Sequence, residues 1–251
     1  MVAVGVLTTL AAHAPAADVW VSKEDMPIET NFSVWLYTKA VARGTTAYVL
    51  ANEAAAYDLA KERWEVIEAP TQRYQAAYAA TDQHVYQIGG NPIPDPWPDP
   101  PARALEEYDP IADTWKEREE MPTPRAGAMA ATSRGKVYVI GGYGGVGYLQ
   151  AVEEYDPRTD TWVEKADLPV PGLVPLASFG ALSEVLAVFA TADIEAGLPV
   201  LSYRPGTDTW TRRDDIPPAP HMGILVDLWP GGAWWAGYSA WTLHRDRLYV
   251  V

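Results

Sequence analysis

The chain contains no cysteine and only four histidines among its 251 residues. The absence of cysteine excludes a disulfide framework, a thiolate zinc site and a thiol nucleophile. No two of the histidines, at positions 13, 84, 221 and 244, are close in the sequence, so a histidine metal site is unsupported. We therefore expect neither a metal ion nor a cofactor.

Basic residues are also scarce. The sequence has 19 Lys and Arg against 33 Asp and Glu, which gives a formal net charge of -14. Nothing in it resembles a basic stripe that would neutralise phosphates and release counterions. We therefore expect neither nucleic acid nor an anionic membrane surface as a partner.

Residues 1–17 differ from the rest of the chain. They form a short apolar run followed by small residues with Ala-x-Ala character, as in the back half of a secretory signal, but a positively charged start is missing. The run is too short to span a bilayer, so no membrane insertion is expected. This leader favours a secreted or periplasmic location over a cytoplasmic one. A disordered leader and a start codon assigned too late remain open. Residues 18–251 are expected to form a single domain.

The rest of the sequence is a tandem repeat. A tyrosine stands seven residues before a tryptophan in four places: Tyr57 and Trp64, Tyr108 and Trp115, Tyr155 and Trp162, and Tyr203 and Trp210. Successive tryptophans of this set are 51, 47 and 48 residues apart. Each unit holds four short runs rich in β-branched and aromatic residues, separated by turn-forming or charged residues. A period of about 50 residues with four strands per unit predicts an all-β chain, a β-propeller of four-stranded antiparallel blades.

The second and third units resemble kelch repeats. In each, two apolar residues and Gly-Gly end a strand, Tyr-Asp-Pro follows, and a tryptophan comes seven residues after the tyrosine. The second unit then ends in the Met-Pro-x-Pro-Arg turn Met121–Arg125. The first and fourth units keep only the tyrosine and the tryptophan. The resemblance implies a β-propeller, and kelch rings more usually have six or seven blades.

The repeated motif residues are expected to have structural roles. The Gly-Gly pairs should let a strand end turn sharply beside its neighbour's backbone. The tyrosines and tryptophans should pack between adjacent blades. Asp113, Asp160 and Asp208 each stand two residues before a tryptophan, where a short side chain can bond its own backbone.

The two ends of the chain are expected to complete one blade. Asp18–Pro27 matches the last strand of a unit without the rest of it, and the fifth unit, which ends in Leu243–Val251, lacks a last strand. Placing Trp20 beside Tyr249 pairs both and hides two exposed strand edges. We therefore predict five blades, the last closed by the N-terminal strand. The alternative is a fragment of a six- or seven-bladed ring.

The loops are the expected place for ligand binding, because a propeller gathers its second-to-third and inter-blade connections on one face. The longest connection, Asn91–Arg103, is rich in proline and contains Trp97, which could serve as a recognition element or as a rigid cover of the channel. The connection between Tyr143 and Leu149 consists mainly of glycine and tyrosine, a composition that favours binding. We take Asn91, Trp97, Tyr143 and Tyr148 as candidate ligand-binding residues.

Two arginines are further candidates. Arg73 and Arg125 occupy the kelch arginine position, and the resemblance implies that they point into the channel mouth, where a guanidinium suits a carboxylate. Asn31 and His221 stand one position past the same point in the first and fifth units. The competing interpretation is that each arginine forms a structural ion pair with a carboxylate of a neighbouring blade.

These features predict a non-catalytic binding module, monomeric, that recognises a protein or a glycan through the loop face. The alternative is a carbohydrate-active enzyme that resembles the sialic acid epimerases, in which Arg73, Arg125 and His221 would meet the sugar carboxylate. The galactose-oxidase type of kelch enzyme needs a cysteine-crosslinked tyrosine, so its chemistry is excluded.

Overall fold

The chain is built from β-strands in the part that the structure describes. The computed structural model describes residues 25–28, 39–51, 53–92, 101–180, 183–190, 197–215, 227–229, 232–234, 241–244 and 247–250, and none of these is helical. No helix in this part is long and apolar enough to cross a membrane. The all-β prediction is confirmed.

Four complete antiparallel blades occupy most of the described chain. Blade 1 consists of β1 (Lys39–Arg43), β2 (Thr46–Leu50), β3 (Ala54–Asp58) and β4 (Arg63–Ile67). Blade 2 consists of β6 (Ala77–Ala80), β7 (Val85–Ile88), β9 (Leu105–Asp109) and β10 (Thr114–Arg118). Blade 3 consists of β11 (Met129–Ser133), β12 (Lys136–Ile140), β13 (Val152–Asp156) and β14 (Thr161–Lys165). Blade 4 consists of β15 (Val174–Gly180), β16 (Val185–Ala190), β17 (Val200–Arg204) and β18 (Thr209–Arg212).

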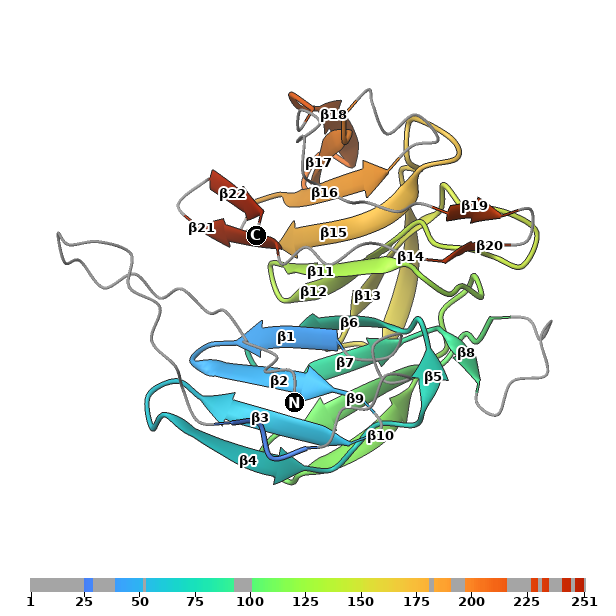
Figure 1. The fold of residues 1–251 in the computed structure, drawn as a ribbon. Coiled ribbons are helices and arrows are strands. Elements are labelled where there is room, and N and C mark those ends of the chain that lie inside the picture. Colours follow the sequence, from blue (N-terminus) through green and yellow to red (C-terminus); the bar gives the residue numbers. More distant parts are fainter. Residues whose placement is uncertain are drawn as a thin grey trace, which may run out of the picture.

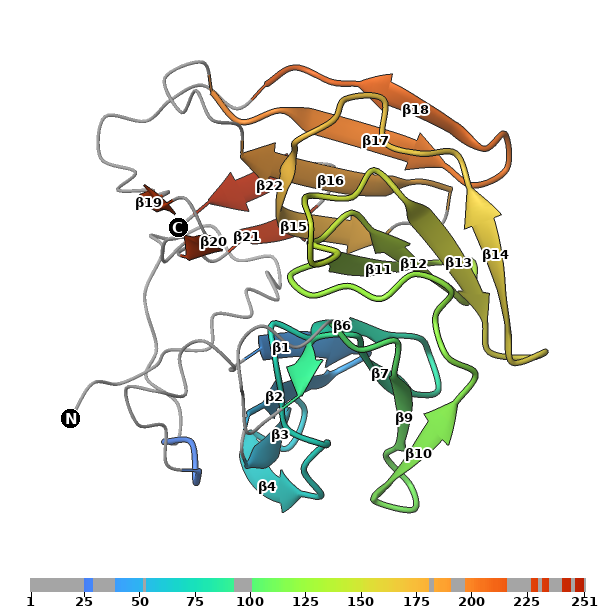
Figure 2. The same ribbon diagram turned by 90° about the vertical axis from the view of Figure 1, so that its right-hand side faces the viewer.

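The blades follow one another around a common axis (Figure 1). Their first strands β1, β6, β11 and β15 lie side by side in chain order near the middle, and their last strands β4, β10, β14 and β18 lie outermost, as Figure 2 shows. This arrangement is a β-propeller, as the period predicted. One short pairing was not predicted: β5 (Arg73–Tyr74) pairs with β8 (Asn91–Pro92) beside blade 2.

The first and fifth units are described only in part. The innermost strand of blade 1 is β1, and residues 29–38 before it lie outside the described residues. In the fifth unit, β19 (Asp227–Trp229) pairs with β20 (Gly232–Trp234). The last run was predicted as one strand, but it forms a hairpin of β21 (Trp241–His244) and β22 (Arg247–Val250), because Arg245-Asp246 interrupts its apolar residues.

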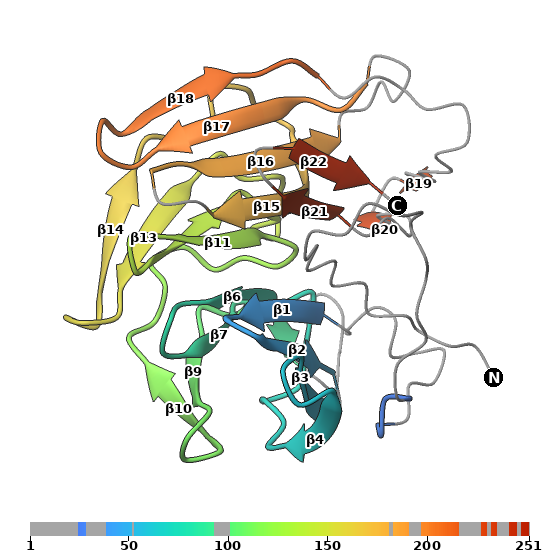
Figure 3. The ribbon, with the colours of Figure 1, turned by 90° about the vertical axis from the view of Figure 1, so that its left-hand side faces the viewer.

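The hairpin of β21 and β22 lies next to β15, on the side of blade 4 where a fifth blade would follow (Figure 3). At the other end of the array, Met26 and the buried Ile28 pack against Val49, Ala55 and Trp64 of blade 1. The predicted contact between Trp20 and Tyr249 cannot be traced because Trp20 lies outside the described residues. Closure of a fifth blade therefore stays a prediction.

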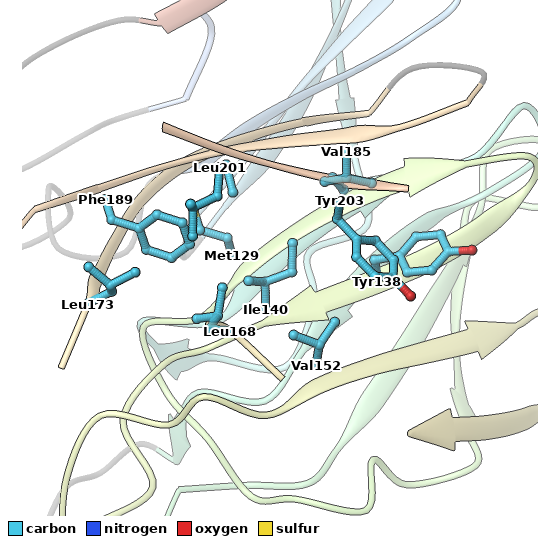
Figure 4. Packing of buried hydrophobic residues seen from close by; sticks show 12 residues of the cluster. Met129, Tyr138, Ile140, Val152, Leu168, Leu173, Val185, Phe189, Leu201 and Tyr203 are labelled. Carbon is cyan, nitrogen blue, oxygen red and sulfur yellow. The ribbon is translucent and has the colours of Figure 1, made fainter. Parts of the chain in front are cut away.

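Apolar side chains from consecutive blades share one core at each seam. Between blades 3 and 4, Tyr138, Ile140 and Val152 meet Phe189 and Tyr203, as Figure 4 shows. Strands alternate between buried and less buried positions where one face meets the next blade. In β11, for example, Met129, Ala131 and Ser133 are buried, and the two residues between them are half-buried. The hydrophobic core is therefore a series of seams between blades.

Each seam is also held by polar contacts between a blade and the connection that precedes it. At the seam of blades 2 and 3, the Tyr155 hydroxyl donates to Asp160 Oδ1 at 2.7 Å. The same oxygen accepts the backbone N–H of Glu119 at 3.0 Å, and Trp162 Nε1 donates to the Glu119 carbonyl at 2.8 Å. We call such a set of tyrosine, aspartate and tryptophan a seam clamp, because it holds both polar groups of one residue of the preceding blade.

Two other seams repeat this geometry. Tyr108, Asp113 and Trp115 hold Glu68 in the same way, and Tyr203, Asp208 and Trp210 hold Ala166. The predicted packing of the aromatic residues between blades is thus confirmed.

The clamp aspartates bond differently from the prediction. Asp113, Asp160 and Asp208 have positive φ angles of 51° to 54° and accept a hydrogen bond from the preceding blade's backbone, not from their own. The local turn is instead capped by the aspartate of Tyr-Asp-Pro. Asp156 Oδ1, for example, accepts the Arg158 N–H at 3.0 Å. The clamp position favours aspartate because its short side chain tolerates the left-handed region.

The Gly-Gly pairs allow backbone segments to approach closely. A Cβ atom on Gly89 would lie 2.3 Å from the backbone oxygen of Arg125, and one on Gly142 would lie 2.9 Å from the oxygen of Ala126. Both glycines also have positive φ angles. Only glycine fits such positions, so the predicted structural role is confirmed.

Removal of a clamp carboxylate should destabilise the propeller. In Asp160→Ala the buried Tyr155 hydroxyl and the Glu119 N–H lose their common acceptor, which we expect to cost about 1–3 kcal/mol of unfolding free energy. Burial raises the pKa of Asp160, but hydrogen bonds from the Glu119 N–H and Tyr155 and the charge of Arg118 outweigh it, so the pKa is lowered. The stabilisation should therefore be present at neutral pH and disappear as the pH falls through the lowered pKa.

Urea denaturation of Asp160→Ala at neutral and acidic pH measures this effect. Asp82→Ala, which changes an exposed aspartate in the turn of blade 2, is the matched control and should leave stability unchanged. Equal stability of the two variants at neutral pH would contradict the role of the clamp.

The clamp of blade 1 can be improved by one substitution. Glu62 stands at the clamp position with a φ of 54°, and among the described residues the buried Tyr57 hydroxyl has no hydrogen-bond partner. Glu62→Asp places a shorter carboxylate where the other clamps bond their tyrosine, and we expect a gain of about 1 kcal/mol. Thermal unfolding measures it, with Glu62→Ala as the control. If Glu62→Asp is no more stable than the wild type, this geometry does not transfer to blade 1.

Candidate functional site

The connections of the propeller gather on two opposite faces. One face, which we call the loop face, carries the connections from second to third strands and from one blade to the next. Its described parts are residues 51, 53, 68–76, 89–92, 101–104, 119–128, 141–151, 166–173, 197–199 and 213–215. The opposite face, which we call the turn face, carries the tight turns, such as the β9–β10 turn around Ile111.

Charge is distributed unevenly on the loop face. Exposed acids stand where the inter-blade connections leave the outermost strands: Glu68, Glu119, Glu120 and Asp167. Towards the axis, residues 137–152 contain no charged residue, and neither do residues 168–180. The described loop face of blades 3 and 4 thus has an uncharged centre and a rim in which acids outnumber bases, since the exposed Arg213 stands beside Glu119, Glu120, Asp167 and Asp214.

A short hairpin projects from the uncharged centre. Tyr143 pairs with Tyr148, the N–H of Gly144 donates to the carbonyl of Gly147 at 3.0 Å, and the Tyr143 hydroxyl donates to the carbonyl of Gly145 at 2.9 Å. The two tyrosine rings meet edge to face with their centroids 5.9 Å apart. We call residues 143–148 the valine hairpin, because Val146 at its tip is fully exposed, at 101%.

Two tight approaches fix the hairpin on the body of the propeller. The Leu149 side chain packs under Gly144, where an added Cβ would lie 3.0 Å from it. At the base, Tyr143 and Ala126 donate to each other's carbonyl at 2.8 and 3.0 Å. Gly145 has a φ of 93° and follows Gly144, a backbone that favours a tight two-residue turn. Tyr143 and Tyr148 are therefore brought together, as their spacing allowed.

Arg125 is turned into the protein. Its side chain is 1% exposed, and Nη2 lies 2.8 Å from Oε2 of the equally buried Glu153 as an ion pair. Nη1 donates to the carbonyls of Gly141 and Ala151 at 3.0 and 2.8 Å. Burial lowers the pKa of Arg125, while the charge of Glu153 raises it in part.

Arg73 has the same environment in blade 2. Its Nη2 lies 3.0 Å from Glu106 Oε2, and its Nε donates to the carbonyl of Gly89 at 2.8 Å. Both arginines thus form structural ion pairs, but the carboxylate does not come from a neighbouring blade. It belongs to the third strand of the arginine's own blade, which is β9 in blade 2 and β13 in blade 3.

The other candidates are less defined. Asn91 is half-buried and pairs through its backbone with Tyr74. Asn31, Trp97 and His221 lie outside the described residues. In the part of the chain that the structure describes, no three His, Asp or Glu residues gather closely enough to hold a metal ion.

The sequence analysis overlooked the doubled glutamates and Val146. In LEEYDP and VEEYDP, the first glutamate pairs with the arginine and accepts a threonine hydroxyl, which comes from Thr71 in blade 2 and from Thr123 in blade 3. The second glutamate binds a cation and a tyrosine hydroxyl, as Glu154 does with Lys136 and Tyr138. Two adjacent acids in an otherwise apolar strand could have indicated buried, paired carboxylates. For Val146 the sequence offered a weaker indication, a single apolar residue among glycines.

Breaking the Arg125 ion pair should destabilise the fold. In Arg125→Met the buried Glu153 loses its cation, and we expect a loss of about 3–5 kcal/mol of unfolding free energy. The double variant Arg125→Met with Glu153→Leu should recover most of this loss, because blade 4 already has a leucine, Leu201, at the glutamate position. Urea denaturation measures both, with Arg158→Met, at an exposed arginine, as the control. A single variant as stable as the control would contradict the structural role.

Comparison with known proteins gives matches among kelch-repeat proteins. The Kelch motif matches residues 124–169. An F-box/kelch-repeat protein of Arabidopsis thaliana is 33% identical over 87 residues, which cover 34% of this chain and 22% of the relative. Kelch repeat and BTB domain-containing protein 13 of Homo sapiens is 28% identical over 133 residues, 49% of this chain and 27% of the relative. The chain therefore spans roughly a quarter of the length of these relatives.

A solved structure, that of YjhT, resembles this chain with a TM-score of 0.61 over 77% of this chain and 68% of that chain. Its sequence identity is 17%, so the likeness concerns the fold alone. The matched motif, the kelch-repeat relatives and the four-stranded blades agree with one another. The motif match and these relatives support a kelch-repeat family for this chain, and its fold is that of a β-propeller.

Proposed function

We propose that this chain is a non-catalytic binding module that holds a protein partner on its loop face. The observation that carries the proposal is the uncharged centre of that face, which displays tyrosine rings and an exposed valine inside an acidic rim. Protein interfaces have this anatomy, with aromatic and apolar groups in the middle and polar groups around them. The kelch-repeat relatives favour an interaction role as well.

A protein ranks before a glycan as the proposed partner. Recognition of an acidic sugar by Arg73 and Arg125 would require free guanidinium groups, and these two are buried against Glu106 and Glu153. The same contacts remove the reason for proposing a sugar-modifying enzyme. A neutral glycan could still stack on the tyrosines, so a glycan array forms one arm of the test.

Charge placed on the loop face should abolish binding. The purified chain is immobilised, and the proteins that it retains from an extract of the source organism are quantified by mass spectrometry. Gln72→Asp and Val170→Asp add a carboxylate at two exposed positions of the loop face, whereas Ile111→Asp adds one at the turn face, where Ile111 is 94% exposed. We expect both loop-face variants to lose the protein that the wild type and Ile111→Asp retain, because an added charge must be desolvated in the interface.

The outcomes separate the alternatives. Loss in Ile111→Asp alone would place binding on the turn face and overturn the proposal. No retained protein together with binding on the glycan array would make the chain a glycan-binding module. Circular dichroism of each variant confirms that the exposed substitutions leave the fold intact.

A further inference from the structure

We propose that the valine hairpin is the principal anchor of the protein partner, and that the partner receives Val146 in an apolar pocket bordered by basic side chains. This inference rests on the proposed function, since it assigns a partner chemistry to the same loop face. It adds that Val146 is the inserting residue, that an apolar pocket of the partner receives it, and that basic side chains of the partner border this pocket.

The valine hairpin is rigid before it binds. The hydrogen bonds within the hairpin, the contact of the two tyrosine rings and the packing of Leu149 under Gly144 hold its backbone from three sides. A loop held in one conformation loses little entropy on association, which raises affinity without any additional contact. A glycine-rich loop without these bonds would have to be ordered first.

Val146 stands apart from the rest of the protein. Its side chain is fully exposed, and apart from the residues adjacent in the chain nothing lies within 4 Å of the position that a Cβ on the neighbouring Gly147 would take. A projecting apolar side chain cannot enclose a small ligand, because small-molecule sites are concave. It can enter a concave site on another protein, where a desolvated apolar anchor contributes much of the binding energy.

The base of the hairpin fixes the charge that the partner meets. Gln150 and Leu168 are joined by two hydrogen bonds, from Leu168 N to Gln150 O at 2.8 Å and from Gln150 Nε2 to Leu168 O at 2.6 Å. Asp167 directly precedes Leu168 and is exposed, so an acid of the rim lies at the foot of the hairpin. A partner that buries Val146 brings its own rim towards Asp167, and basic side chains match it.

Three variants and a competitor test the inference on the protein that the wild type retains. Val146→Asp should weaken its binding about tenfold or more, since an anchor of an interface is lost and a charge enters the pocket. Val146→Thr, which keeps the shape of valine, should weaken it less. Ile111→Asp should bind as the wild type does. A cyclised peptide of residues 143–148 should compete with the intact chain, and the same peptide with aspartate in place of valine should not.

Asp167→Lys tests the charged part of the inference. It should slow association severalfold at low salt and have little effect at high salt, because exposed charges are screened. Surface plasmon resonance measures both rates. A binding constant unchanged in Val146→Asp would overturn the inference. If Gln72→Asp and Val170→Asp still abolish binding in that case, the proposed function stands without this anchor. If these two loop-face variants also bind as the wild type does, or if the wild type retains no protein, both the inference and the proposed function are wrong.

Discussion

The structure depends on a carboxylate that accepts a backbone N–H from the connection that precedes its blade. Blades of a propeller are separate sheets, so strand pairing cannot satisfy the polar groups of the connections between them. At three seams an aspartate and a tryptophan satisfy the N–H and the carbonyl of one residue, and a tyrosine below them joins the apolar core. One set of residues thus joins blade to blade, supplies hydrogen bonds and fills the seam.

This constraint explains which parts of the repeat vary. Blade 4 has lost the Gly-Gly pair, the arginine and both glutamates but keeps Tyr203, Asp208 and Trp210. The arginine and its glutamate are absent together from blades 1 and 4: no basic residue occurs between Lys165 and Arg204, and Leu201 replaces the glutamate. A buried charge without its partner is costly, so the pair is kept or lost as a unit.

Spacing made most of the fold predictable. The separation of tyrosine and tryptophan is imposed by a hairpin of fixed register, in which Tyr155 lies directly opposite Trp162, so the period could be read from four copies. The hydrogen-bond partner of each aspartate was not predictable. The Glu119 N–H donates to Asp160, 41 residues away, and this pairing depends on how two sheets pack. The orientation of the Arg125 side chain was not predictable for the same reason, because a sequence does not show whether a guanidinium faces the channel or Glu153.

The valine hairpin lies in a connection that the sequence analysis named as a candidate for ligand binding, and its role in binding stays a proposal. The glycine and tyrosine composition indicated a binding loop at residues 143–149, but the anchor inferred from the structure is the valine among them. The buried arginines and the exposed Val146 together determine the chemistry of the loop face. Pairing Arg73 and Arg125 inside their own blades removes two cations from the loop face and leaves its centre without charge. A protein partner of the kind proposed would then be held there through shape and apolar contact, with charge confined to the rim, so affinity and association rate should respond to different residues.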